Sequence, residues 1–420
     1  MKTNRLRAVL AGFGLSAMLL FSENCFAEEG KDTAAEAAQT EAGIVTNSIP
    51  GWPQAADITA TAGVVLEDSH DVILYNKNMD APLYPASAVK IMTTLLALEN
   101  SSLEDSVTMT ATGVSGVTDG GVSISSQLDE VFTMEQCLYA IMLASANDIA
   151  LQVAEHVGGS VDAFVSMMND RAAELGCTNT VFTNPTGLPD ENQHTTAHDL
   201  ALIMQAAIAN TSFRTISSAM SYTIPATNVS GGERILSNNL GLLNQASPTY
   251  YTGCLGGKEG STTASGTTLV TAAERDDMTL ICVVLQGRPE DTENQAIQLM
   301  DYGFDNFSLL DLGRNDFDLI SGGIVLAPSQ STADSFSIED VQTSEEIHRT
   351  YYFSDIPVGT ALVANPVKED ESLTVSGEEN MAAAQAYSTN KTWIPYAVIG
   401  GIGLLFILLL FRKMIKIIRA

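Results

Sequence analysis

Short apolar runs stand near both ends of the central part of this chain, and they predict β-strands. Residues 63–67 and 72–75 are two such runs, and the polar residues 68–71 between them predict a hairpin. The strands come from two widely separated parts of the chain, because further β-prone runs appear some two hundred residues later. These later runs cover 253–258, 267–272 and 278–285, with the polar residues 274–277 as a second hairpin turn.

The section between these strands has helical periodicity. In SVDAFVSMMNDRAAELG, apolar residues recur at helical spacing between an N-cap candidate, Ser160, and a C-terminal glycine, Gly176. Residues 196–209 have the same character, and a last helix is expected over 292–302. Strands on both sides of a helical region predict one sheet assembled from both ends of an α+β domain, which we place at residues 49–309.

The composition changes on either side of this domain. Residues 28–48 are rich in Ala, Glu and Thr with little to bury, which indicates a disordered spacer. Residues 310–376 contain short apolar runs broken by Pro and Gly, and they predict a small all-β domain. A polar linker is expected over residues 377–393.

Residues 1–27 have the pattern of a secretory signal peptide. Lys2, Arg5 and Arg7 precede an apolar stretch, and Cys25-Phe26-Ala27 provides small residues at the cleavage positions. An N-terminal membrane anchor is the weaker interpretation because the apolar stretch is short. We therefore expect this segment to direct export of the chain.

A second apolar segment lies at the other end of the chain. Residues 394–411, IPYAVIGGIGLLFILLLF, form an uncharged run of 18 residues, long enough for a transmembrane helix, with Trp393 and Tyr396 as interface aromatics. Basic residues follow in the tail 412–420, and the positive-inside rule places this tail in the cytoplasm. The sequence predicts a single-pass cell-membrane protein whose body is extracytoplasmic.

The charge balance narrows the range of partners. The chain has 20 Lys and Arg against 50 Asp and Glu, a net charge of -30, which argues against nucleic acid as a partner because phosphates require a basic surface. Outside the leader, the cysteines show no paired C-x-x-C metal pattern. We expect these cysteines to be mostly buried and to act as small apolar side chains, with one disulfide among them as the alternative. These cysteines are Cys137, Cys177, Cys254 and Cys282.

The candidate chemistry begins with YPASAVK, residues 84–90, which precedes an apolar helical run. Ser87 and Lys90 stand three residues apart, so a helix would place them on one face. A serine attacks well only when a neighbour accepts its proton, and an amine can do so only if burial or other cations lower its pKa. Ser87 could also present its own backbone N–H to an oxyanion. Alternatively, Lys90 could reach solvent from a surface helix.

Two further clusters indicate the same kind of site. Ser145 and Asn147 follow an apolar segment, where a hydroxyl and an amide could pass a proton and hold a carbonyl, although Ser and Asn also favour plain helix caps. Lys258, Gly260 and Ser261 lie at the end of a predicted strand, after two glycines that would let a ligand approach the backbone; a plain turn is the alternative. The three clusters in this order are more specific than any one of them.

On these motifs the sequence resembles the serine D-Ala-D-Ala carboxypeptidases among the low-molecular-mass penicillin-binding proteins. YPASAVKIMTTLLALEN is similar to their nucleophile helix, MLASANDIALQVAEHVGGS to their S-x-N segment, and GGKEGSTTASGTTLVTAAERDDMTLICVVLQG to their K-T-G strand and hairpin. The resemblance covers about residues 50–310, and more weakly 312–376. It implies a β-lactamase/DD-peptidase-like fold, in which an antiparallel sheet accompanies a helical region.

The resemblance also implies a reaction. Ser87 would attack the carbonyl between the two terminal D-alanines of a peptidoglycan stem peptide and form an acyl-enzyme, with Lys90 as the base. Ser145 would pass a proton toward the leaving D-Ala. β-Lactam antibiotics would then acylate the same serine.

Substrate binding would involve the remaining motif residues. Asn147 would bind the substrate's amide carbonyl, and Lys258 would supply positive charge. Gly260 belongs to the same binding strand, and the amides of Ser87 and Ser261 would form the oxyanion hole.

One position departs from the family pattern. Where the family has a threonine or serine that helps to hold the substrate's terminal carboxylate, this chain has Glu259. A carboxylate there could repel that substrate by roughly 1 to 4 kcal/mol, or it could turn away and pair with Lys258. We favour retained activity because the other motif residues are present. The alternative is a catalytically impaired module that binds penicillin or muropeptides, whereas a β-lactamase is disfavoured because the chain has no E-x-x-L-N segment.

A metal site is not expected. His194 and His198 stand four residues apart beside Asp199, a spacing that could place two ligands on one helical face. The glutamate of an H-E-x-x-H motif is missing and the residues lie at a helix start, so capping and packing explain them better. We therefore predict neither a metal nor a cofactor.

Overall fold

The structure is a computed structural model that describes residues 44–117, 121–314, 318–343 and 346–365. The expected leader, the polar linker, the apolar run 394–411 and the basic tail lie outside the described residues. Within the described ranges, every helix is too short or too polar to cross a membrane.

A five-stranded antiparallel sheet forms the centre of the molecule, in the order β2-β1-β9-β8-β7. Its strands come from both ends of the domain, as the sequence predicts, and the α+β fold class is confirmed. The two expected hairpins are present; the second is a two-residue turn in which Asp276 and Asp277 both have positive φ. The strands are β1 (Ala62–Glu67), β2 (Val72–Lys77), β7 (Cys254–Thr262), β8 (Gly266–Arg275) and β9 (Met278–Gly287).

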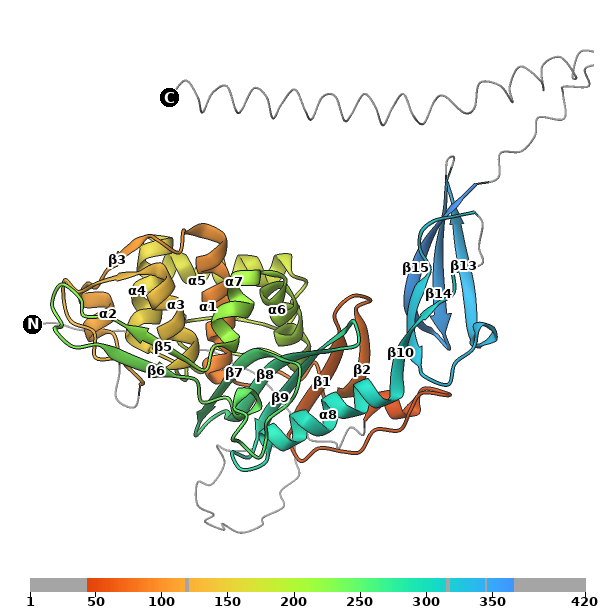
Figure 1. Ribbon diagram of the computed structural model, residues 1–420, viewed down its shortest axis with the longest axis horizontal. Helices are drawn as coiled ribbons and strands as arrows, with labels where there is room; N and C mark the ends of the chain where they lie inside the picture. Colours follow the sequence, from red (N-terminus) through yellow and green to blue (C-terminus); the bar gives the residue numbers. More distant parts are fainter. Residues whose placement is uncertain (1–43, 118–120, 315–317, 344–345, 366–420) are drawn as a thin grey trace, which may run out of the picture.

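Both faces of this sheet are covered. Every residue of β1 is buried, and its side chains alternate between the two cores: Val64 and Leu66 face the helical region, whereas Val65 faces helix α8 (Thr292–Asn306). Burial on both faces explains why the strand is continuously apolar up to Glu67. Figure 1 shows the helices at one end of the sheet, with α8 on its other side.

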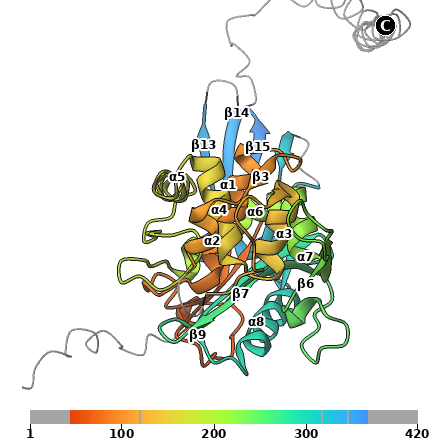
Figure 2. The same cartoon turned by 90° about the vertical axis from the view of Figure 1, so that its left-hand side faces the viewer.

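Seven helices form the other layer. Seen from the helical end, they gather above β7 (Figure 2). Helix α1 (Val89–Asn100) is central, since its residues from Val89 to Ala97 are all buried. The other six are α2 (Ala111–Ser115), α3 (Met134–Leu143), α4 (Asn147–Gly158), α5 (Val161–Glu174), α6 (Ala197–Ala209) and α7 (Thr211–Ser218). Two antiparallel strand pairs border them: β3 (Ser106–Thr108) with β4 (Val131–Thr133), and β5 (Ser221–Ile224) with β6 (Arg234–Ser237).

Local signals in the sequence explain where the helices begin. The Ser160 hydroxyl accepts from the Ala163 amide at the start of α5, and Gly176 follows its end with φ 85°. Thr196 caps α6 in the same way through the Asp199 amide. The Asp199 carboxylate binds elsewhere, accepting from the backbone amide of Asn179.

Beyond α8, the chain forms an all-β module of two sheets, with orders β10-β12 and β11-β15-β14-β13. The aromatic ring of Trp52 joins the module to the main sheet, because it packs 4.9 Å from Phe307 and 5.8 Å from Phe353 while its Nε1 donates to the Leu74 carbonyl. The strands are β10 (Phe307–Asp311), β11 (Leu319–Gly322), β12 (Ile324–Pro328), β13 (Phe336–Gln342), β14 (Glu346–Phe353) and β15 (Ile356–Ala364).

Three 3-10 helices complete the regular structure outside the motif region: η1 (Val45–Ser48), η3 (Gly241–Leu243) and η4 (Ala333–Ser335). The first corrects the sequence analysis, which extended the disordered spacer to Ser48. Thr46 is buried, and the Asn47 side chain hydrogen-bonds to both backbone groups of Ala55. These contacts order the segment even though its own composition is poor in large apolar residues.

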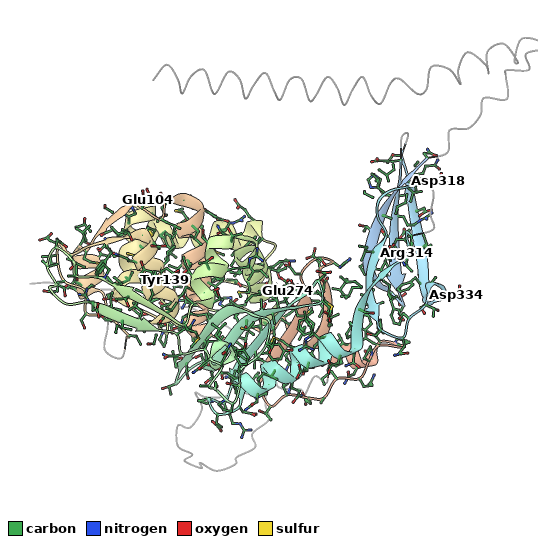
Figure 3. All side chains as sticks on the ribbon, in the orientation of Figure 1. Glu104, Tyr139, Glu274, Arg314, Asp318 and Asp334 are labelled. Carbon is green, nitrogen blue, oxygen red and sulfur yellow. The ribbon has the colours of Figure 1, made fainter. Side chains whose placement is uncertain are left out.

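The excess of acidic residues is found on the molecular surface, and the described cysteines do not form disulfides. Exposed acidic residues occur on both parts of the molecule, for example Glu104 on the helical side, Glu274 at the end of β8 and Asp334 on the β module (Figure 3). The four cysteines among the described residues are all free, with Cys137 and Cys282 fully buried, so the disulfide left open by the sequence does not form.

Candidate active site

Ser87 lies in a short 3-10 turn, η2 (Ala86–Ala88), directly before α1. Ala86 has φ 47°, a left-handed conformation that is costly for a residue with a side chain and is found where surrounding contacts impose it. The Gly187 position supplies that contact, because a Cβ there would lie 1.8 Å from the Ala86 carbonyl oxygen. The turn is therefore held from outside, and it presents Ser87 at the edge of the core.

Lys90 is the second residue of α1 and is buried, with 1% of its surface exposed. Its Nζ donates to Asn147 Oδ1 at 2.7 Å and to the Thr186 carbonyl, and it lies 3.4 Å from Ser87 Oγ. The alternative in which this lysine reaches solvent is therefore wrong. Burial holds the pKa of Lys90 well below its ordinary value, and the charge of Lys258 acts in the same direction.

These three neighbours suit an uncharged amine. A neutral amine has two N–H donors and one lone pair. Asn147 Oδ1 and the Thr186 carbonyl can use both donors, which leaves the lone pair for the hydroxyl hydrogen of Ser87. The site therefore contains a base positioned beside a hydroxyl.

Ser145 approaches the same hydroxyl from the turn between α3 and α4. Its Oγ donates to Ser87 Oγ at 3.0 Å, so the Ser87 hydrogen remains free to point at Lys90. Ser145 has φ 56°, and the chain reverses sharply there before Asn147 begins α4. Because the reversal is tight, the side chains of Ser145 and Asn147 both reach the start of α1.

Strand β7 forms the opposite wall of the site. It runs through Thr262, past the expected end at Lys258, because pairing with β8 continues to Thr262 opposite Gly266. Gly260 packs against the serine turn so closely that a Cβ there would lie 2.5 Å from the Ser87 amide nitrogen. Ser261 follows at the exposed edge of the strand.

A cleft of about 200 Å³ lies between these elements. The structure thus brings all seven candidate residues together around one serine, although they come from three distant parts of the chain. The cleft is lined by Ser87, Val122, Met142, Leu143, Ser145, Asn238, Asn239, Leu240, Gly257, Lys258, Glu259, Gly260 and Ser261.

Lys258 and Glu259 carry the charges of this cleft. Burial lowers the pKa of Lys258 to about 8, while the neighbouring Glu259 acts in the opposite direction. The pKa of Glu259 is raised by burial and by Glu293, against the effect of Lys258. The direct pairing of Glu259 with Lys258 that the sequence analysis considered does not form within the described residues.

The Thr186 carbonyl is the functional group that the sequence analysis missed. It belongs to the segment Asn184–Gly187, where the Asn184 side-chain oxygen accepts from the amides of Thr186 and Gly187. Thr93 of α1 binds the same segment by donating to the Pro185 carbonyl at 2.8 Å. The Asn-Pro-Thr-Gly sequence signals a turn, but it gives no sign that a main-chain carbonyl there binds a lysine.

The two histidines have structural contacts. His194 Nδ1 lies 3.1 Å from the Asn192 carbonyl, and His198 Nδ1 lies 3.5 Å from Asp80. In the described part of the chain, no group of three or more His, Cys, Asp or Glu side chains could hold a metal ion.

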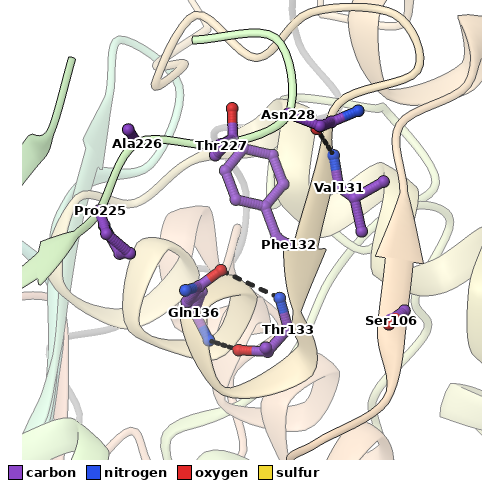
Figure 4. A pocket seen from close by; sticks show the side chains of 9 residues that line it. All are labelled: Ser106, Val131, Phe132, Thr133, Gln136, Pro225, Ala226, Thr227 and Asn228. Atoms are coloured by element: carbon purple, nitrogen blue, oxygen red, sulfur yellow. Dashed lines mark hydrogen bonds between the residues drawn. The ribbon is translucent and has the colours of Figure 1, made fainter. Parts of the chain in front are cut away.

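A second hollow, of about 280 Å³, lies beside β4 and contains none of the candidate residues (Figure 4). Its polar groups bind one another: Asn228 Oδ1 accepts from the Val131 amide, and Thr133 and Gln136 form a capping box at the start of α3. We assign it a structural role.

The geometry combines a nucleophile candidate, Ser87, with a buried amine beside it and a second hydroxyl in contact, an arrangement suited to acyl transfer. The family model of the D-alanyl-D-alanine carboxypeptidases, peptidase family S11, matches residues 50–289. The chain belongs to this family, so the predicted resemblance is confirmed.

Individual relatives agree with this assignment. D-alanyl-D-alanine carboxypeptidase DacF of Bacillus subtilis (strain 168) is 31% identical over 254 residues, which cover 59% of this chain and 63% of DacF. This chain thus spans a little under two thirds of that relative's length.

Solved structures show the same fold. The crystal structure of the D-alanyl-D-alanine carboxypeptidase from Mycobacterium tuberculosis H37Rv has a TM-score of 0.55 at 31% identity, covering 61% of this chain and 95% of the other. Penicillin binding protein 6B from Escherichia coli, with a TM-score of 0.64 at 23% identity, covers 76% of this chain and 98% of its own and supports the fold alone.

The contact between Gly260 and Ser87 provides the first test. In Gly260→Ala, the new Cβ would displace the serine turn, and a misplacement of about 1 Å at a reacting atom can cost ~100-fold in rate. We expect labelling of Ser87 by a fluorescent penicillin to slow by about that factor. Gly232→Ala is the matched control, since a Cβ at Gly232 meets nothing within 4 Å. Equal labelling rates for the two variants would contradict the geometry.

Proposed function

We propose that this protein removes the terminal D-Ala from peptidoglycan stem pentapeptides through an acyl-enzyme on Ser87, and that β-lactams acylate the same serine. The observation that carries the proposal is the position of Ser87 Oγ, which lies 3.4 Å from Lys90 Nζ and 3.0 Å from Ser145 Oγ in one cleft. Membership of the carboxypeptidase family supports the choice of substrate.

In the acylation step, Ser87 Oγ attacks the carbonyl carbon of the scissile bond while its proton moves to the neutral amine of Lys90. The developing oxyanion is held by the backbone amides of Ser87 and Ser261, an arrangement commonly worth about 3 to 4 kcal/mol for each donor. The close packing of Gly260 on the Ser87 turn fixes this strand beside the nucleophile.

In the departure step, the C–N bond breaks and the leaving D-Ala nitrogen takes a proton. Ser145 is in hydrogen-bond contact with Ser87, so it can pass the proton from Lys90 toward that nitrogen. Water then attacks the acyl carbon while the neutral amine of Lys90 takes one of its protons. The bond between the acyl carbon and Ser87 Oγ breaks, Oγ takes that proton from Lys90, and the shortened peptide is released with a new carboxyl group.

Two residues position the substrate in this scheme. Asn147 uses its side-chain oxygen for Lys90, which leaves its NH₂ group to donate to the substrate's amide carbonyl. Lys258 contributes positive charge to the cleft that Ser87 and Ser145 line.

Replacing the nucleophile tests the proposal directly. Ser87→Ala should lose both D-Ala release from a pentapeptide, measured by a coupled amino-acid assay, and covalent labelling by penicillin, because the Oγ that forms the acyl bond is gone. Ser329→Ala, at an exposed position on the β module, should keep both. Rapid D-Ala release by Ser87→Ala would remove this serine from the mechanism. If the unmutated protein is labelled by penicillin but releases no D-Ala, the impaired binding module would be favoured.

The two lysines predict the pH dependence of acylation. Lys90 acts without its proton, and its lowered pKa makes the rate rise with pH well below the range of an ordinary lysine. Lys258 acts with its proton, so the rate should fall again above pH of about 8. The second-order rate constant for penicillin acylation between pH 5 and 10 checks this bell shape.

The control for this profile is Lys258→Arg. A guanidinium keeps its charge at every pH of the experiment, so any activity that this variant retains should lose the fall near pH 8. A native rate that still rises above pH 9 would contradict the assignment of Lys258.

We further propose that the chain is exported through residues 1–27 and held in the cell membrane by residues 394–411, with the catalytic part outside the cytoplasm. The 18-residue uncharged run and the basic residues after it support this arrangement. A chain that ends at residue 390 should be released from membranes by an alkaline carbonate wash, while the full chain stays in the membrane fraction. Release of the full chain by the same wash would disprove the anchor.

A further inference from the structure

The cleft contains a carboxylate, Glu259, at the position where the resemblance predicts a hydroxyl residue. Glu259 lines it together with Ser87 and Ser145, and its side chain is half-buried. Among the described residues, no hydrogen bond or ion pair joins this carboxylate to another group. Glu259 therefore adds to the lining of the cleft a negative charge that has no hydrogen-bond or ion-pair partner within the described ranges.

The neighbouring charges define what the cleft can accept. Lys258 is its buried cation, without a hydrogen-bond or ion-pair partner in the described part of the chain. Glu293, at the start of α8, is a second carboxylate nearby, and its oxygens are held by the Gly241 amide at 2.6 Å and by the Thr249 hydroxyl. With Lys90 neutral, the negative charges of Glu259 and Glu293 outweigh the single positive charge of Lys258.

A threonine or serine in place of Glu259 would give a different balance of charges around the cleft. Threonine carries no charge, so Lys258 would offset Glu293 and the hydroxyl could donate to an anion. With Glu259 in place, a second carboxylate that enters from the substrate meets repulsion, whereas a group with N–H donors meets a free acceptor.

We propose that Glu259 is a specificity-determining residue that makes this cleft prefer leaving groups without a free carboxylate beside the scissile bond. The preferred substrates are D-alanyl peptides whose leaving residue carries a carboxamide at that place. The free acid is cleaved by the same route but more slowly. This inference rests on the proposed acyl transfer at Ser87 and specifies its substrate class.

The test uses the purified full-length protein in detergent and two N-acylated peptides that differ only at the C-terminus, one ending in D-Ala-D-Ala and the other in its carboxamide. The measured quantity is the ratio of kcat/KM for the carboxamide to kcat/KM for the free acid. We expect the native ratio to exceed one, and to fall at least tenfold in both Glu259→Gln and Glu259→Thr. The glutamine variant keeps the shape of the side chain and removes only its charge.

Glu104→Gln is the matched control, because Glu104 is exposed on the helical side of the molecule (Figure 3) and should leave the ratio unchanged. An unchanged ratio in Glu259→Gln would overturn the inference, while continued D-Ala release would keep the proposed function. If the variants fail to fold, the unmutated protein still provides a test: a higher kcat/KM for the free acid than for the carboxamide overturns the inference. Failure of the native protein to cleave either peptide would overturn both proposals.

Discussion

The burial of one amine is the constraint on which this site depends. Lys90 is enclosed by three separate parts of the chain: its own helix, the start of α4 and the turn that ends at Gly187. A charged ammonium in that position would lose its hydration, so the enclosure favours the neutral form. The packing of the core around α1 therefore favours the uncharged form of Lys90, on which the proposed acyl transfer depends.

The sequence predicts much of this fold because the relevant signals are local. Polar turns between β-prone runs mark both hairpins, and the capping hydroxyls of Ser160 and Thr196 mark the starts of α5 and α6. The boundaries that were wrong depend on contacts with a neighbouring segment of the chain. Strand β7 continues past Lys258 because β8 pairs with it, and η1 is ordered because Asn47 binds Ala55. Neither contact leaves a pattern in the segment itself.

The candidate site likewise contains residues that the sequence reveals and a group that only the structure reveals. Ser87, Lys90 and Ser145 could be selected from the sequence because their side chains carry recognisable chemistry in motifs with a fixed order. The Thr186 carbonyl could not be selected in this way, since every residue of the chain has an equivalent main-chain oxygen. Glu259, the unusual neighbour of Lys258, could be identified from the sequence. Only the structure shows that its carboxylate has no hydrogen-bond or ion-pair partner among the described residues.

The aromatic junction at Trp52 has a mechanical consequence. Its ring touches residues from the first strand of the β module, Phe307, and from a later one, Phe353, while its nitrogen is bonded to the main sheet. Closely packed rings of this kind resist bending. The β module is therefore held against the main sheet by packed rings as well as by the chain connection, so its orientation relative to the cleft depends on this packing.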